Sequence, residues 1–233
     1  MRSLNNVEII SINTTDPHRS VGALRHSCTD IHFHNVKLLS HTRPNNISND
    51  IQYIEIPKFT TRKEYSKFCL FDLFNYITSD YVLMIHSDGF IINPNMWSDE
   101  FLEYDYIGAP WPKRVMKEWN STNRVGNGGF CLRSKRLIDY LPKISHLWET
   151  ISKQKFDEDY VNEDVFISTN EILLHKFKFA PIELAMRFSY ELPIEEHSSC
   201  NYDLTKFFGF HGRHTRETYD MVNNYHAVWD KEI

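Results

Sequence analysis

The sequence lacks the features that are typical of secreted, zinc-binding or membrane-spanning proteins. Its four cysteines include no pair in a C-x-x-C spacing, which argues against a zinc site or a thioredoxin-like motif. Their positions do not resemble a disulfide framework, so we expect a reducing compartment. The first residues form no apolar leader, and no run approaches about 18 apolar residues. We therefore expect a cytoplasmic protein without a membrane span, peripheral at a membrane if its substrate lies there.

Two further absences narrow the range of ligands. The formal net charge of -5 gives no general attraction for nucleic acid or anionic lipid, so we expect no nucleic-acid partner. The eight glycines form neither the G-x-x-x-x-G-K-[ST] pattern of a P-loop nor the G-x-G-x-x-G pattern of a dinucleotide site. Any nucleotide must therefore be bound in another way.

Strand and helix patterns alternate in the first half of the chain. Continuous apolar runs predict buried strands, and apolar residues three and four apart predict helices between them. This order favours one α/β domain with a mostly parallel sheet and right-handed crossovers. The predicted strands are 7–13, 36–39, 51–56 and 81–85, and the predicted helices are 18–31 and 61–77.

The second half of the chain has less regular patterns. Residues 113–124 are polar and have no period, which predicts a loop. Cys69 and Cys131 lie within apolar patterns and are expected in the core. Further predicted strands are 104–109, 130–132 and 179–182, and further predicted helices are 95–101, 134–141, 160–177 and a polar helical tail.

The predicted strand 81–85 runs directly into a short polar turn, residues 86–89 (HSDG). Ligands of parallel sheets bind at the carboxyl ends of the strands. We therefore expect His86, Ser87 and Asp88 at the rim of the sheet, facing a crevice. The alternative is that Asp88 only caps the turn before Gly89.

Asp88 and His211 are candidate ligands of a divalent cation. Mg²⁺ bound with phosphates uses one or two carboxylates, and Mn²⁺ also accepts imidazole. The alternative for His211 is a loop histidine bonded to backbone. Glu163 and Asp164 are a further acidic pair at a predicted helix start, where the helix dipole alone also favours negative charge.

Residues 126–129 (GNGG) indicate a place where the backbone comes close to a ligand or a strand. Asn127 has an amide that suits a sugar hydroxyl, and Gly128 and Gly129 leave room beside it. The alternative is a tight turn without a ligand.

Five segments, in this order, resemble a poorly characterised GT-A-like glycosyltransferase family of bacteria and large viruses. The resemblance covers roughly residues 5–215 and implies sugar transfer from a nucleotide-sugar. The segments are 87–90 (SDGF), 106–111 (YIGAPW), 126–130 (GNGGF), 162–166 (NEDVF) and 210–212 (FHG).

The resemblance also implies roles for single residues. Asp88 matches the metal-binding acid of the Asp-x-Asp turn of GT-A enzymes, whereas His86 stands where that turn has its first acid. This departure puts the metal dependence in question. Asp164 matches the general base of related inverting enzymes, Glu163 beside it would orient the acceptor, and His211 matches a late metal ligand.

The donor and acceptor contacts follow more loosely from the resemblance. Residues 86–88 would contact the donor. The end of the first strand binds the nucleotide in this fold, which indicates Asn13, Thr14, Thr15 and the nearby Arg25. Trp111 is a candidate platform for an acceptor sugar, or else an aromatic at the edge of the core.

The sequence thus predicts a single-domain GT-A-like protein over residues 1–233. A nucleotide-sugar half (about 5–92) precedes an acceptor and catalytic half (about 93–215) and a helical tail (216–233). We expect transfer from a UDP-sugar to a glycan, lipid-linked or protein acceptor, assisted by Mn²⁺ or Mg²⁺ and inverting. The alternatives are a nucleotide-sugar hydrolase and a non-catalytic sugar- or nucleotide-binding module.

Overall fold

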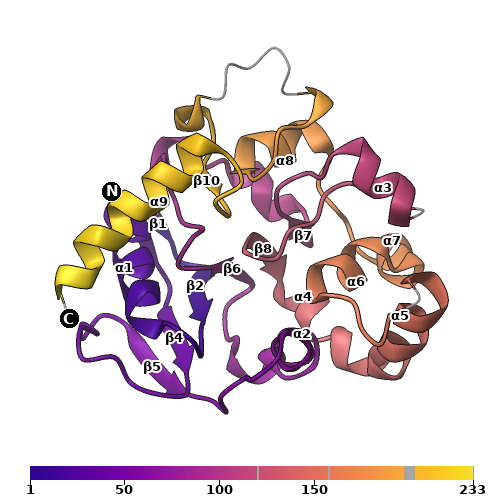
Figure 1. Cartoon of the computed structure of the whole chain (residues 1–233), viewed down its shortest axis with the longest axis horizontal. Coiled ribbons are helices and arrows are strands. Elements are labelled where there is room, and N and C mark those ends of the chain that lie inside the picture. The colour runs from indigo at the N-terminus through magenta and orange to yellow at the C-terminus, as the bar shows by residue number, and fades with distance from the viewer. Residues whose placement is uncertain (120, 157, 197–202, 233) are drawn as a thin grey trace.

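The protein is built around a six-stranded sheet (Figure 1). A computed structural model describes residues 1–119, 121–156, 158–196 and 203–232. Its main strands are β2 (Val7–Ile12), β4 (Val36–Ser40), β5 (Gln52–Glu55), β6 (Tyr81–Ile85), β7 (Tyr106–Ile107) and β8 (Phe130–Ser134). Their order is β5-β4-β2-β6-β8-β7; the first four are parallel, and β8 is antiparallel to both of its neighbours. The predicted α/β fold with a mixed, mostly parallel sheet is confirmed.

Strands β2 and β6 lie side by side at the centre of this sheet. Their register pairs Val7 with Tyr81 and Ser11 with Ile85. Every residue of β2 is buried, because its apolar side chains meet packed layers on both faces. The two strands end together, so residues 13–16 and 86–89 leave the sheet at the same edge.

Three helices flank the strands of the first half of the chain. They are α1 (Pro17–Ser27), α2 (Arg62–Phe71) and the C-terminal α9 (Arg216–Trp229). A capping box of Thr61 and Glu64 starts α2. The C-terminal helix α9 packs against α1, where a Cβ at Gly22 would overlap the Trp229 ring. Figure 1 shows the yellow α9 lying beside the indigo start of the chain.

Shorter elements complete the second half. Two small parallel ladders join β1 (Arg2–Leu4) to β3 (Ile31–Phe33) and β9 (Ser189–Tyr190) to β10 (Gly209–Phe210). The remaining helices are α3 (Lys113–Trp119), α4 (Lys135–Ile138), α5 (Trp148–Phe156), α6 (Glu163–Thr169), α7 (Glu171–Lys176) and α8 (Ile182–Phe188), with several 3₁₀ turns between them.

Two predicted elements are wrong. The loop predicted at 113–124 contains helix α3, which buries Met116; its mostly polar sequence gives no visible period. The strand predicted at 179–182 is reduced to one bridge between Phe179 and Tyr106, because Pro181 caps α8 instead.

Other predicted elements are shorter in the structure. The α-helix predicted over 61–77 ends at Phe71 and continues as a 3₁₀ turn, and that over 18–31 ends at Ser27. The helix predicted over 160–177 is two helices, since the Asn170 side chain accepts hydrogen bonds from the first amides of α7.

Cys69 and Cys131 are fully buried, as predicted for core residues. With Cys28 they are free thiols, and Cys200 lies outside the described residues. Over the described ranges, no helix is both long enough and apolar enough to cross a bilayer.

Candidate active site

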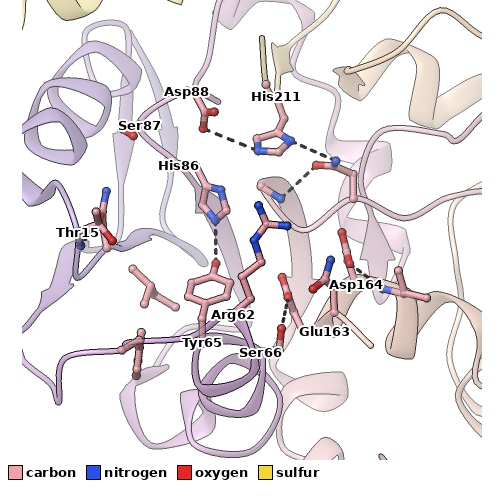
Figure 2. A pocket seen from close by; sticks show the side chains of 18 of the residues that line it. Thr15, Arg62, Tyr65, Ser66, His86, Ser87, Asp88, Glu163, Asp164 and His211 are labelled. Carbon is pink, nitrogen blue, oxygen red and sulfur yellow. Dashed lines mark hydrogen bonds and ion pairs between the residues drawn. The ribbon is translucent and has the colours of Figure 1, made fainter. Parts of the chain in front are cut away.

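A cavity of about 940 Å³ opens at the carboxyl ends of β2 and β6. Most of the residues that the sequence singles out line it, and Figure 2 shows how several of them converge. They are Asn13, Thr14, Thr15, His86, Ser87, Asp88, Trp111, Asn127, Gly129, Glu163, Asp164 and His211.

Two predicted site residues do not line the cavity. Arg25 lies on α1, where its guanidinium donates to the Asn46 carbonyl at 3.4 Å. Gly128 is not among the residues that line the cavity, and its amide donates to Asp164 Oδ2 at 3.0 Å. Arg25 is thus placed away from the other donor candidates, and Gly128 contacts a site residue through its backbone.

Backbone contacts hold the turn 86–89 tightly. The amides of His86 and Gly89 donate to each other's carbonyl oxygens at 3.1 and 3.2 Å. The Gly212 amide donates to the Asp88 carbonyl at 2.8 Å, and His226 Nε2 lies 2.7 Å from the Ser87 carbonyl. The Asp88 side chain therefore projects from a rigid support.

His86, Asp88 and His211 could hold a metal ion together. One ligand atom from each lies within 4.8 Å of the others, and Asp88 Oδ1 is 3.8 Å from His211 Nε2. His86 Nε2 lies 2.7 Å from the Tyr65 hydroxyl, which leaves Nδ1 as its second nitrogen. One carboxylate and two imidazoles fit Mn²⁺ well and Mg²⁺ less well.

The protonation of His86 and Asp88 suits a metal. Burial, and then the charge of His211, lowers the pKa of His86 to about 4, so its imidazole is neutral at neutral pH. Burial raises the pKa of Asp88, but the nearby His211 and His86 more than offset this, so the pKa lies below its ordinary value. A carboxylate and a neutral imidazole are the forms that bind metals.

Glu191 orients His211 from behind. Its Oε1 lies 3.3 Å from His211 Nδ1 and 3.5 Å from His214 Nε2. Burial lowers the pKa of His211, but the hydrogen bond and charge of Glu191, together with the charges of Asp88 and Asp164, outweigh it and raise the pKa overall. A carboxylate on Nδ1 directs Nε2 toward Asp88, the arrangement common behind metal-bound histidines.

The segment 126–129 lets site residues approach the backbone. A Cβ at Gly129 would overlap the His211 ring, and a Cβ at Gly128 would overlap Glu163 Oε1. Asn127 has a positive φ of 62°, and its amide nitrogen is 3.2 Å from His211 Nδ1. Its amide nitrogen therefore contacts a site histidine, and the predicted contact of Asn127 with a sugar hydroxyl stays a prediction.

Glu163 and Asp164, at the start of helix α6, differ in burial and in hydrogen bonding. Asp164 accepts hydrogen bonds from the amides of Gly128 (3.0 Å) and Val165 (2.8 Å), and burial raises its pKa despite them. Glu163 is 5% exposed and accepts a hydrogen bond from Ser66 at 3.2 Å. Burial, and then the Asp164 charge, raises the pKa of Glu163 to about 7. Asp164 is thus the more accessible and better bonded carboxylate.

Two tryptophans form an aromatic wall. Trp111 and Trp119 meet edge to face with ring centroids 4.7 Å apart, and both line the cavity. A Cβ at Gly126 would overlap the Trp111 ring, so this glycine lets the indole approach. Trp111 is buried, which agrees with an aromatic at the core edge and leaves part of the ring toward the cavity.

The end of β2 forms a rigid turn on the other side of the cavity. The Asn13 side chain accepts from the amides of Thr15 (2.9 Å) and Asp16 (2.8 Å). Thr14 Oγ1 accepts from the Phe59 amide at 3.1 Å. Asn13 and Thr14 therefore fix the backbone of this turn. Thr15 lies beside the cavity (Figure 2).

A family model described as "Protein of unknown function (DUF5672)" matches residues 49–211, well over half of the chain. The chain belongs to the DUF5672 family. The matched segment carries Asp88, Glu163, Asp164 and His211, and leaves out β2 and α9. No curated protein matches this DUF5672 chain by sequence.

Solved structures of glycosyltransferases share the fold of this DUF5672 member. Galactosyltransferase LgtC, in complex with donor and acceptor sugar analogs, matches with a TM-score of 0.57 and 13% identity over 96% of this chain and 95% of LgtC. GlyE of Streptococcus pneumoniae TIGR4 matches with a TM-score of 0.54 and 11% identity over 97% of this chain and 61% of GlyE.

A third similar structure is a glycosyltransferase involved in glycosylation of the major capsid of PBCV-1. Its TM-score is 0.52 with 11% identity, over 95% of this chain and 99% of that protein. The predicted resemblance to GT-A glycosyltransferases is therefore confirmed for the fold. At these identities the similarity shows the fold of this DUF5672 chain and nothing about its substrates.

The sequence analysis missed several residues that line the cavity of the DUF5672 chain. Arg62, Tyr65 and Ser66 share one face of α2, and Figure 2 shows the Arg62 side chain extending into the cavity. Their spacing of three and four indicates one shared helix face. It was overlooked because the apolar residues of the same helix have the same spacing. Glu191 and His214 belong to no motif, so only the fold reveals them.

Proposed function

We propose that this chain is a metal-assisted glycosyltransferase that transfers a sugar from a nucleotide-sugar, with a UDP-sugar as the first donor to test. The observation that carries the proposal is one cavity in which His86, Asp88 and His211 lie across from Asp164. A metal-ligand set and a separate carboxylate are what a leaving diphosphate and an attacking hydroxyl need. The fold shared with the glycosyltransferases LgtC and GlyE supports the same assignment.

The donor half of the site is formed by residues 5–92 together with His211. Asp88, His211 and His86 would hold Mn²⁺, or Mg²⁺ more weakly. The bound cation would neutralise negative charge on the leaving nucleoside diphosphate. The Asn13–Thr15 turn and Ser87 lie where the nucleotide would enter, and Arg62 adds a positive charge inside the cavity.

The acceptor half is formed by residues 93–215. In the proposed step an acceptor hydroxyl oxygen bonds to the anomeric carbon while the bond to the diphosphate breaks. The hydroxyl proton goes to Asp164, whose pKa is raised by burial. Trp111 and Trp119 would stack on the acceptor, a glycan, lipid-linked sugar or protein. A single displacement of this kind inverts the anomeric configuration.

A donor panel tests this proposal. Purified protein with Mn²⁺ is incubated with UDP-, GDP- and dTDP-sugars, with and without saccharide acceptors, and nucleotide release and sugar products are measured. The proposal expects acceptor-dependent release with one nucleotide class. Equal release without acceptor would indicate a hydrolase, and binding without turnover by any donor and acceptor would indicate a binding module.

A further inference from the structure

A buried charge pair lies directly behind the proposed base. Arg133, on β8, is fully buried, and its Nη2 is 3.7 Å from Oε1 of the almost equally buried Glu163. Glu163 precedes Asp164 at the start of α6. The pair therefore connects the sheet to the residue next to the proposed base.

Arg133 has few other polar contacts. Its Nε donates to Cys131 Sγ at 3.3 Å, and its guanidinium lies over the Tyr106 ring, 5.6 Å from the centroid. Among the described residues, neither of its terminal nitrogens has a hydrogen-bond partner. A guanidinium buried this deeply requires a nearby negative charge, and the Glu163 carboxylate provides it when ionised, above its pKa of about 7.

Glu163 ties the start of α6 to three other segments. Its Oε2 accepts from Ser66 on α2, its Oε1 faces Arg133 on β8, and the same Oε1 occupies the space that a Cβ at Gly128 would fill. The Gly128 amide in turn donates to Asp164. Movement of Glu163 would therefore disturb the hydrogen bond that orients Asp164.

We propose that Arg133 and Glu163 are positioning residues that hold the Asp164 carboxylate on the Gly128 amide and facing the cavity. The importance of this for catalysis rests on the proposed function, in which Asp164 is the base. The positioning itself concerns the protein alone. This positioning role is distinct from the acceptor-orienting role predicted for Glu163, which stays a prediction.

The Gly128 amide provides a readout that needs no catalysis. In the metal-free protein, we expect Arg133→Met to shift the Gly128 N–H resonance and to speed its hydrogen exchange by about tenfold or more. Glu163→Gln keeps the shape and the Ser66 contact, so we expect a smaller change of the same kind. An unchanged Gly128 amide in both variants would overturn the proposal.

A second buried charge pair provides a matched control. Lys37 and Glu8 are as buried as Arg133 and Glu163, form an ion pair between β4 and β2, and do not line the cavity. Lys37→Met should lower stability as Arg133→Met does, yet leave the Gly128 amide unchanged. An equal effect of both variants on that amide would mean general loosening and would overturn the proposal.

The double variant Arg133→Met/Glu163→Leu separates positioning from stability. Removing both charges should recover much of the stability lost in Arg133→Met. The Gly128 amide should nevertheless remain perturbed, because a leucine side chain cannot make the polar contacts of Glu163. Recovery of both stability and the wild-type Gly128 resonance would contradict a positioning role.

Activity completes the test. If the wild type transfers sugar, Arg133→Met should lower kcat about tenfold or more while the donor KM stays within about twofold. Unchanged kcat would overturn the catalytic part of the inference. If the wild type transfers no sugar while the Gly128 amide responds as expected, the proposed function fails and the positioning of Asp164 stands.

Discussion

At the residue scale, the site depends on a few side chains with one clear task each. Asp88 is the only carboxylate of the proposed donor-side ligand set, which otherwise consists of His86 and His211. Asp88 stays ionised at neutral pH despite its partial burial, because the nearby His211 and His86 lower its pKa. Metal binding should therefore depend strongly on this one residue.

Replacing Asp88 by Asn should weaken Mn²⁺ binding by about tenfold or more, because the ligand set loses its negative charge. Titration calorimetry with Mn²⁺, alone and with UDP, measures this directly. Asp139→Asn is a matched control, since it removes the same charge from a surface residue paired with Lys135. Equal Mn²⁺ affinity of the Asp88 variant and the wild type would remove Asp88 as a ligand.

Replacing Asp164 by Asn should leave donor binding intact and lower kcat by about 10²–10⁴-fold, the usual worth of a general base. The amide can still accept hydrogen bonds from Gly128 and Val165, so the local fold should survive. Donor affinity by calorimetry and single-turnover rates measure the two effects separately. Transfer at the wild-type rate would exclude Asp164 as the base.

At the scale of elements, the C-terminal helix α9 supports the turn 86–89, although the helix lies outside the matched family segment. His226, on α9, is within hydrogen-bond distance of the Ser87 carbonyl and of Arg213. Trp229 fixes the same helix against Gly22 of α1. The C-terminal helix thus contacts both α1 and the turn that carries Asp88.

Replacing His226 by Ala should lower stability by about 1–3 kcal/mol, the cost of leaving a buried polar group unpaired. It should also weaken Mn²⁺ binding severalfold, because the turn that carries Asp88 loses one support. Denaturant unfolding and Mn²⁺ calorimetry measure the two effects, with His175→Ala on the exposed side of α7 as control. A loss of stability with unaltered Mn²⁺ affinity would separate α9 from the site.

The sequence was sufficient to predict the elements with strong patterns. Apolar runs located β2, β4 and β6, and the alternation with helices predicted a parallel sheet whose strand ends form the site. Helix α3 was missed because its sequence is mostly polar, and α8 because Pro181 gives no sign of a following helix. The positions of Glu191 and Arg133 depend on packing between distant segments, which no local pattern records.

At the scale of the whole molecule, burial of Glu163 links stability to pH. Its pKa is raised from an ordinary value of about 4.5 to about 7 in the folded protein, so the folded state binds a proton more tightly than the unfolded state. This contribution to stability is present in full below about pH 4.5 and is lost as the pH rises through about 7. Arg133 opposes the shift without removing it.

The variant Glu163→Gln should lack this pH dependence. The free energy of unfolding of the wild type, minus that of the variant, should therefore decrease from about pH 5 to about pH 7.5. The wild type loses stability relative to the variant over this range. Urea unfolding in metal-free buffer measures it, and Glu149→Gln, at an exposed position, is the control. A difference that stays constant across this range would mean that the pKa of Glu163 is not raised.

The central claim is sugar transfer from a nucleotide-sugar to an acceptor hydroxyl. Proton NMR of the anomeric region tests it most directly, with wild-type protein, Mn²⁺, the donor selected from the panel and its acceptor. We expect a new glycosidic signal whose anomeric configuration is opposite to that of the donor, and none without acceptor. Free sugar as the sole product, or unchanged donor across the whole panel, would contradict the account.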